Sequence, residues 1–283
     1  MSVRIAEGIY SFTAEGDAMI HGWGANQGFI ITSEGVVVVD TGFTRFRAEE
    51  LRSEIRKITD YPIALVINTH DHSDHVFGNS VIADIGTPIM SHETCNKNVS
   101  QYGIGRMESY RSDIETVRTA LEGLDILPSS ETYESDFSFD LGEKRFEIIH
   151  PDRGAHTFGD TMVFLPDDGV LFTGDVMWEK YHPNLEDANI QGWMTSLEEI
   201  SQLELRHVLP GHGTPTTKES MMEFHDYLLR FDQWMRSSFS AFNDPATMIF
   251  EDPESQDWKL RMIVNRNIAI LYERFKSDYS RRL

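Results

Sequence analysis

The segment from Asn68 to His75 places three histidines and two aspartates within six residues, directly after the short apolar run IALVIN at 63–68. Imidazoles and carboxylates this close together at the end of a buried strand repel or desolvate one another unless a cation compensates them. Alternate side chains of an extended loop point the same way, so His70 and His72 can bind one ion. Asp74 and His75 can face a second ion as the chain turns into a helix. Neither pair completes a coordination shell, so the fold must bring further ligands from distant parts of the sequence.

Three later segments offer these ligands in loops where glycine lets the backbone approach a metal closely. GAHTFGD at 154–160 carries His156, FTGDV at 172–176 carries Asp175, and LPGHG at 209–213 carries His212. His150 ends a predicted strand and is expected to be structural or to support a ligand from behind. The histidines interpreted as ordinary surface or core residues are His21, His92, His207 and His225.

The only cysteine is Cys95, which excludes an internal disulfide and a thiolate-rich metal site. Any metal must therefore be bound by imidazoles and carboxylates. These ligands suit zinc, iron and manganese alike, and zinc is the default expectation.

The acidic balance restricts the partners of this chain. Its 46 Asp and Glu residues outnumber 25 Lys and Arg residues, giving a formal net charge of −21. Nucleic-acid binding depends on basic residues, so a small-molecule substrate is expected instead. No apolar run approaches the roughly 18 residues of a membrane span, and the first residues do not resemble a signal peptide, which predicts a cytoplasmic protein without membrane association. The oligomeric state stays open.

The first half of the chain alternates predicted strands and helices. Apolar runs at 9–12, 28–33 and 36–40 predict antiparallel strands, with a tight turn at 33–35. Helical spacing of Ala48, Leu51, Ile55 and Ile58 predicts a helix over 44–59. A buried strand at 63–68, a helix over 75–85 and a strand at 88–91 follow. The polar segment 95–130 is interpreted as an inserted helical segment that could form a lid.

The second half repeats this alternation. Strands are predicted at 137–140, 144–150, 161–165, 170–174 and 207–210, and a helix over 194–204. Two C-terminal helices are expected within 216–283, the first beginning at a capping box formed by Thr216 and Glu219. Two blocks of strands and helices without a linker predict a single domain over residues 1–283, with an α/β (α+β) fold in which helices enclose two sheets.

The order HxHxDH, GAHTFGD, TGD and PGHG resembles the metallo-β-lactamase superfamily, and the resemblance extends from VVVVDTG at 36–42 to PGHG at 210–213. It implies the four-layer αββα sandwich of that family. It also implies a ligand set in which Asp175 bridges two metal ions. The first ion would be bound by His70, His72 and His156, and the second by Asp74, His75 and His212. Asp40 matches a family position near the metals that is mainly structural.

The same resemblance implies a metal-dependent hydrolase. Two divalent metal ions would activate a shared water as a bridging hydroxide, with Asp74 as the catalytic residue that accepts or passes the proton. Dedicated β-lactamases of the family usually have cysteine or serine in place of Asp175, whereas thioesterases, lactonases and phosphodiesterases have the carboxylate. We therefore predict hydrolysis of an ester, thioester, lactone or phosphodiester, with weak β-lactamase activity compatible with a promiscuous site.

Several alternatives stay open. A dedicated β-lactamase is one. A mononuclear iron enzyme that oxidises persulfides, similar to the persulfide dioxygenases of the family, is another, although it would leave several of the seven ligands without a metal. An RNA-processing nuclease is disfavoured by the acidic charge, and a non-catalytic binding protein by the complete ligand set.

Aromatic and apolar residues near the ligand motifs are candidates for substrate binding, with ordinary packing as the equal alternative. They are Trp23 in the loop HGWGAN, which could be a flap, Tyr102, Met107 and Tyr110 in the inserted segment, and Trp178, Tyr181 and His182 after Asp175. We also expect Asn68, Thr157 and Asp160 to orient ligating imidazoles through hydrogen bonds.

Overall fold

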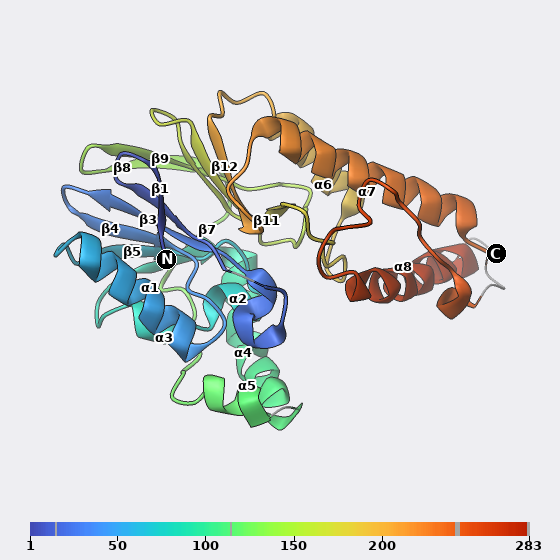
Figure 1. Cartoon of the computed structure of the whole chain (residues 1–283), viewed down its shortest axis with the longest axis horizontal. Helices are drawn as coiled ribbons and strands as arrows, with labels where there is room; N and C mark the ends of the chain where they lie inside the picture. Colours follow the sequence, from blue (N-terminus) through green and yellow to red (C-terminus); the bar gives the residue numbers. More distant parts are fainter. Residues whose placement is uncertain (15, 114, 241–243, 282–283) are drawn as a thin grey trace.

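A computed structural model describes residues 1–14, 16–113, 115–240 and 244–281. Of the remaining residues, 114 belongs to the expected inserted segment, and 241–243 and 282–283 belong to the expected C-terminal region; they lie outside the described residues. Two β-sheets face each other, and helices cover their outer sides (Figure 1). Within the described residues, no helix has an apolar stretch long enough for a bilayer crossing.

The N-terminal sheet has seven strands in sequential order. The first four are antiparallel: β1 (Val3–Ala6), β2 (Ile9–Phe12), β3 (Gln27–Thr32) and β4 (Gly35–Val39). The others run parallel to β4: β5 (Ile63–Ile67), β6 (Ile89–His92) and β7 (Glu131–Tyr133). Parallel neighbours require crossover connections, which the helices between them provide.

The C-terminal sheet has the order β12-β11-β10-β9-β8. Its strands are β8 (Phe137–Leu141), β9 (Lys144–Ile149), β10 (Met162–Leu165), β11 (Val170–Trp178) and β12 (His207–His212). Only β11 and β12 are parallel, and α6 (Ile190–Ile200) lies in the connection between them. The carboxyl ends of β11 and β12 therefore lie at the same edge of the sheet.

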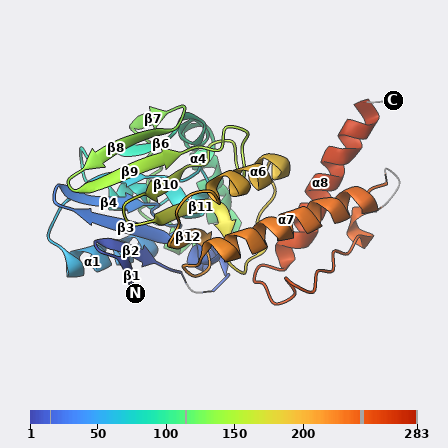
Figure 2. The ribbon, with the colours of Figure 1, turned by 90° about the horizontal axis from the view of Figure 1, so that it is seen from above.

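The remaining helices have the following bounds: α1 (Arg45–Ile58), α2 (Ser73–Val76), α3 (Asn79–Ile82), α4 (Glu93–Asp113), α5 (Glu115–Ala120), α7 (Lys218–Ser238) and α8 (Met262–Arg281). Two 3-10 segments are η1 (Met19–Gly24) and η2 (Pro245–Thr247). Helices α7 and α8 extend away from the two sheets (Figure 2).

The valine run of β4 shows how the layers are built. Val37 and Val39 pack between the two sheets, whereas Val36 and Val38 pack on the other side of the sheet with Ala48 and Leu51 of α1. Successive side chains of a strand point to opposite faces, so a strand covered on both sides is apolar throughout. These two cores, together with the core under α6, confirm the αββα sandwich.

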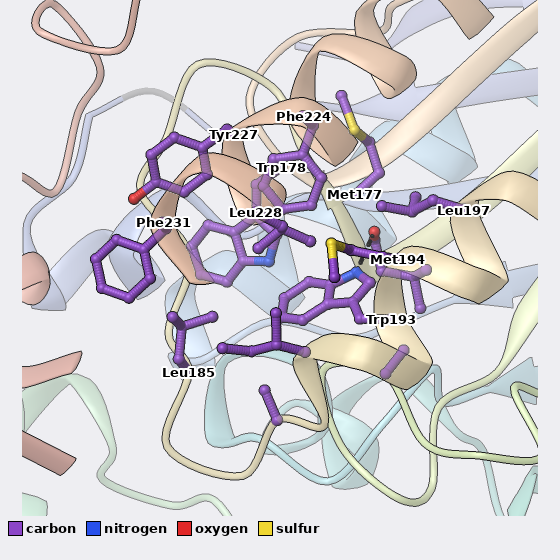
Figure 3. Packing of buried hydrophobic residues seen from close by; sticks show 14 of the residues in the cluster. Met177, Trp178, Leu185, Trp193, Met194, Leu197, Phe224, Tyr227, Leu228 and Phe231 are labelled. Carbon is purple, nitrogen blue, oxygen red and sulfur yellow. Dashed lines mark hydrogen bonds between the residues drawn. The ribbon is translucent and has the colours of Figure 1, made fainter. Parts of the chain in front are cut away.

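The core outside the second sheet joins β11 to α6, α7 and α8. Figure 3 shows Trp178 and Trp193 among the side chains of α7, including Phe224, Tyr227 and Phe231. The indole nitrogen of Trp193 donates to the carbonyl oxygen of Val176 at 2.8 Å. This bond satisfies the polar group of a fully buried tryptophan and fixes α6 on β11.

Several expected boundaries are wrong. The helix expected over 75–85 is two short helices, α2 and α3, because the Gly78 amide donates to the Gly42 carbonyl and the His75 carbonyl accepts from the Thr41 amide, in place of bonds within one helix. Helix α6 begins at Ile190 rather than 194, since Asn189 caps it by accepting from the Gly192 amide. The cap of α7 is Thr217 rather than Thr216. Strands β1 and β7 were not predicted.

Helix α1 offers a matched test of core packing. Leu51 is fully buried against the sheet, whereas Phe46 is 70% exposed on the same helix. We expect Leu51→Ala to lower the free energy of unfolding by about 2–5 kcal/mol, because it opens a cavity. Phe46→Ala should change it by less than about 0.5 kcal/mol. Urea unfolding followed by circular dichroism measures both, and equal effects would contradict this packing.

Candidate metal centre

The seven predicted ligands lie together at one edge of the sandwich. His70, His72, His156 and Asp175 form one cluster and Asp74, His75 and His212 a second, and within each cluster the ligand atoms lie within 4.8 Å of one another. The first motif follows β5, Asp175 lies in β11, His212 ends β12, and His156 lies in the loop between β9 and β10. Strand ends from both sheets thus supply a His/Asp metal-binding site.

Several polar atoms of the ligand residues are buried and make no hydrogen bond: Nε2 of His70, His75 and His212, Nδ1 of His156, and Oδ1 of Asp175. In addition, His156 Nε2 lies 2.9 Å from His72 Nδ1. Buried polar atoms are normally satisfied, and unsatisfied ones destabilise the folded state. Imidazole nitrogens and carboxylate oxygens aimed at one another in this way fit divalent cations.

Asp175 is the centre of the arrangement. Its carboxylate oxygens lie 3.7 Å from His70 Nε2, 3.1 Å from His75 Nε2, and 3.4 Å from Nε2 of both His156 and His212. The side chain is only 2% exposed. A buried carboxylate in contact with four imidazoles is placed to bind cations of both clusters.

Electrostatics support this interpretation. Burial raises the pKa of Asp175, but the charges of His212, His75 and His70 outweigh burial and hold that pKa well below its usual value. Burial lowers the pKa of His212, yet Asp175 and Asp74 raise it to about 9. Burial alone dominates at His156 and lowers its pKa to about 3. The carboxylates thus attract positive charge into a buried site, as a cation site requires.

Asp40 orients two of the imidazoles. Its Oδ2 accepts from His75 Nδ1 at 2.7 Å and from the Thr69 hydroxyl at 2.7 Å, and its Oδ1 accepts from the Thr69 amide at 2.8 Å. The Thr69 oxygen lies 3.1 Å from His70 Nδ1 and can accept that proton. Both imidazoles therefore present Nε2 to the site. This agrees with the structural role expected for Asp40, whose backbone has a positive φ of 60°.

Two of the other three imidazoles, those of His212 and His72, are oriented by groups that the sequence did not reveal. His212 Nδ1 donates to the backbone carbonyl of Trp23 at 3.1 Å. His72 Nε2 donates to Asp187 at 3.1 Å, from the loop between β11 and α6. A backbone carbonyl has no sequence signature, and Asp187 is one acidic residue among 46.

Helix α4 fixes the loop that carries the first ligands. Arg106 donates to both the carbonyl oxygen and the carboxylate of Asp71 at 2.8 Å, and Asn98 donates to the same carboxylate at 3.1 Å. The Asp71 carboxylate is therefore bound to α4 and is not one of the ligand clusters.

The loop of His212 approaches Asp175 closely. A Cβ atom at Gly211 would lie 2.0 Å from Asp175 Oδ1, so any other residue would displace the carboxylate. Asn26 holds this loop by donating to the carbonyl oxygens of Pro210 and Gly213 at 2.9 and 2.6 Å.

Two of the predicted substrate-binding residues lie beside the site. Trp23 packs on Phe43 and Tyr110, with ring centroids 5.3 and 5.9 Å apart. Burial and the charge of Asp74 raise the pKa of Tyr110, whose hydroxyl hydrogen-bonds Ser73. Substrate contact by Trp23 and Tyr110 stays a prediction, as it does for Tyr102, which is 48% exposed on α4.

The other four are at most 3% exposed and make contacts of their own, and substrate contact stays a prediction for them as well: Met107, Trp178, Tyr181 and His182. Trp178 instead stacks on His212, with centroids 3.9 Å apart, and donates to the Asp175 carbonyl. Tyr181 donates to the Gly16 carbonyl, and His182 Nδ1 lies 3.0 Å from the Tyr227 hydroxyl. They support the ligands and the core.

The expectation that Asn68, Thr157 and Asp160 orient ligating imidazoles is wrong. Asp160 accepts from the amide and hydroxyl of Thr157 at 2.8 and 2.7 Å and so closes the loop that carries His156. Asn68 pairs with Asn79 of α3. These hydrogen bonds shape the ligand loops, and none of them goes to a ligating imidazole.

Comparisons with known proteins agree with this geometry. A family model described as "Metallo-beta-lactamase superfamily" matches residues 22–212. The metallo-beta-lactamase type 2 of Elizabethkingia meningoseptica is 21% identical over 240 residues, which are 83% of this chain and 87% of that protein. A linear primary-alkylsulfatase of Pseudomonas sp. (strain ATCC 19151) is 23% identical over 252 residues, which are 73% of this chain and 46% of that protein. The chain thus spans about half of the alkylsulfatase.

Solved structures show the same fold. A metallo-beta-lactamase from Pontibacter korlensis matches with a TM-score of 0.66 and 21% identity, covering 81% of this chain and 98% of that one. The DIM-1 metallo-beta-lactamase matches with a TM-score of 0.63 and 20% identity, covering 81% and 96%. At these identities the likeness is one of fold alone.

The role of Asp40 can be tested with a matched pair of Asp→Asn variants. Asp40→Asn keeps the side-chain shape but removes the charge that holds His75 and Thr69, so metal affinity should fall roughly 10–100-fold. Asp84→Asn, which removes an exposed partner of Arg52, should leave it unchanged. Competition with a chromophoric chelator measures both affinities, and an unaltered affinity in Asp40→Asn would exclude this role.

Proposed function

The chain is a hydrolase of the metallo-beta-lactamase superfamily, and we propose that it uses two divalent metal ions, zinc by default, to hydrolyse a small-molecule substrate. The observation that carries this proposal is the buried carboxylate of Asp175 in contact with four imidazoles of the two clusters. It favours a dinuclear site over a mononuclear iron site, which would leave one cluster without a metal.

The residues divide between the two ions as the clusters do. His70, His72 and His156 would hold one ion, Asp74, His75 and His212 the other, and Asp175 would contact both. Divalent ions in such a site lower the pKa of a shared water from about 15.7 towards about 7 and polarise a carbonyl or phosphoryl oxygen.

Asp74 is the residue that we propose to move the proton. Its Oδ2 lies 3.5 Å from His212 Nε2 and 3.8 Å from His75 Nε2, and its side chain is 10% exposed, more than that of Asp175 at 2%. This greater exposure supports a role in which the carboxylate would take a proton from the nucleophilic water and deliver it to a leaving group. The neutral hydroxyl of Tyr110 nearby can donate a hydrogen bond to the substrate.

The surroundings favour an ester-like substrate with an apolar part. Trp23 and Tyr110 pack on each other and on the buried Phe43 near Asp74, and their aromatic rings suit an apolar acyl or alkyl group. We propose esters, thioesters, lactones and phosphodiesters as the substrate class, and the alkylsulfatase relative adds sulfate esters. The lactamase relatives support a β-lactam as a second candidate substrate. Because Asp175 stands where dedicated β-lactamases usually have cysteine or serine, we propose only a weak side activity.

Metal analysis together with a substrate panel tests the proposal. We expect two zinc ions per chain and turnover of at least one of a lactone, thioester, phosphodiester, alkyl sulfate or chromogenic cephalosporin. Removing the ions with a chelator should abolish turnover, and adding zinc should restore it. One iron per chain with oxidation of a persulfide and no hydrolysis would overturn the proposal.

Matched histidine variants locate the activity. His70→Ala removes a fully buried ligand and should lower kcat/KM by about a hundredfold or more. His207→Ala changes an exposed histidine at the start of β12 and should leave kcat/KM unchanged. Equal activities in the two variants would contradict the assigned ligand set.

A further inference from the structure

The segment after residue 212 lies outside the family match, yet it contacts the loop that follows β11. The Lys259 amide donates to the Lys180 carbonyl, and the His182 amide donates to the Lys259 carbonyl, each at 3.0 Å. Farther along, the fully buried Asn267 of α8 donates to the Pro183 carbonyl at 2.8 Å and accepts from the Leu185 amide at 3.0 Å. These bonds hold the beginning of the loop.

Arginines of α8 hold its end. Arg274 donates to the carbonyl oxygen of Ala188 at 3.0 Å and to that of Glu186, and Arg266 pairs with the Glu186 carboxylate. Helix α8 uses a different set of side chains, including Val264, Ile268 and Leu271, to pack in the apolar core with α7. The apolar side chains of α8 hold the helix in place, and its polar contacts with residues 183–189 are additional to this packing.

The same loop contacts the metal centre. Asp187 accepts from His72, and the Asn189 amide donates at 2.9 Å to the carbonyl oxygen of Ala155, the residue before His156. The Asn189 side chain also donates to the Arg153 carbonyl at 2.8 Å. Two of the three imidazoles of the first cluster are thus connected to residues 183–189.

We propose that α8 is a positioning element of the metal centre, which holds His72 and His156 in their binding geometry through residues 183–189. Asn267 and Arg274 are the positioning residues. The inference rests on the proposed function, because it concerns the affinity of the four-residue cluster for its metal ion. It predicts that a change in α8, which lies outside the family match, lowers the metal affinity of the four-residue cluster more than that of the three-residue cluster.

Arg274→Met tests this, since it retains the aliphatic part of the side chain but removes both donors to the loop. We expect about a tenfold weaker binding of one of the two zinc ions, measured by stepwise competition with a chromophoric chelator. Arg274→Lys, which restores one donor, should recover part of the loss. In an Asp74→Ala background, where only the four-residue cluster stays complete, Arg274→Met should produce the same loss.

The matched control is Arg230→Met. Arg230 lies on α7 and donates to Asp252 at 3.1 and 3.0 Å, so its loss perturbs the same C-terminal region without touching residues 183–189. It should lower the thermal midpoint but leave both zinc affinities unchanged. Unchanged zinc affinities in Arg274→Met would overturn this inference but not the proposed function. An equal loss of zinc affinity in Arg230→Met would do the same. A wild-type chain that binds no divalent ion would overturn the proposed function as well.

Discussion

The burial of Asp175 among four imidazoles is the constraint on which the rest of this structure depends. An ionised carboxylate removed from water is strongly destabilising unless it is paired and hydrogen-bonded. Here the neighbours are histidines whose ligating nitrogens make few other bonds. The centre therefore requires positive charge from cations. Because the buried polar site is destabilising in itself, the fold needs enough apolar packing elsewhere to offset it. The inter-sheet core and the core under α6 and α7 provide that packing.

Precise orientation comes from groups behind the ligands. Asp40 follows the central strand β4 and fixes the tautomers of His75 and, through Thr69, His70. The Trp23 carbonyl does the same for His212. Because η1 also carries the Trp23 ring that packs on Tyr110, one short segment both supports a ligand and borders the proposed substrate region. A change in that segment affects ligand geometry and substrate fit together.

The sequence allowed prediction of what depends on local pattern. Short apolar runs revealed most strands, helical spacing revealed α1, and the strand-end position of His70 to His75 indicated where the ligands would meet. Elements that depend on tertiary contacts were not predicted from the sequence. The expected helix is interrupted at Gly78 because the Gly78 amide donates to the Gly42 carbonyl, and β7 is a three-residue edge strand with little pattern of its own. Met107 and Tyr181 sit in mixed sequence, so only the packed structure distinguishes core from site. A single domain over residues 1–283 stays a prediction.

The two halves of the metal centre are supported by different parts of the chain. Ligands of the second cluster are held from within the family match, by Asp40 and the Trp23 carbonyl. In the first cluster, His72 and the loop of His156 depend on residues 183–189, which are themselves bonded to α8. Without those contacts His72 and the loop of His156 would have more conformational freedom to lose when an ion binds. On the proposed arrangement, the affinity of the first cluster therefore depends on α8, whereas the affinity of the second depends on contacts made by Asp40 and the Trp23 carbonyl.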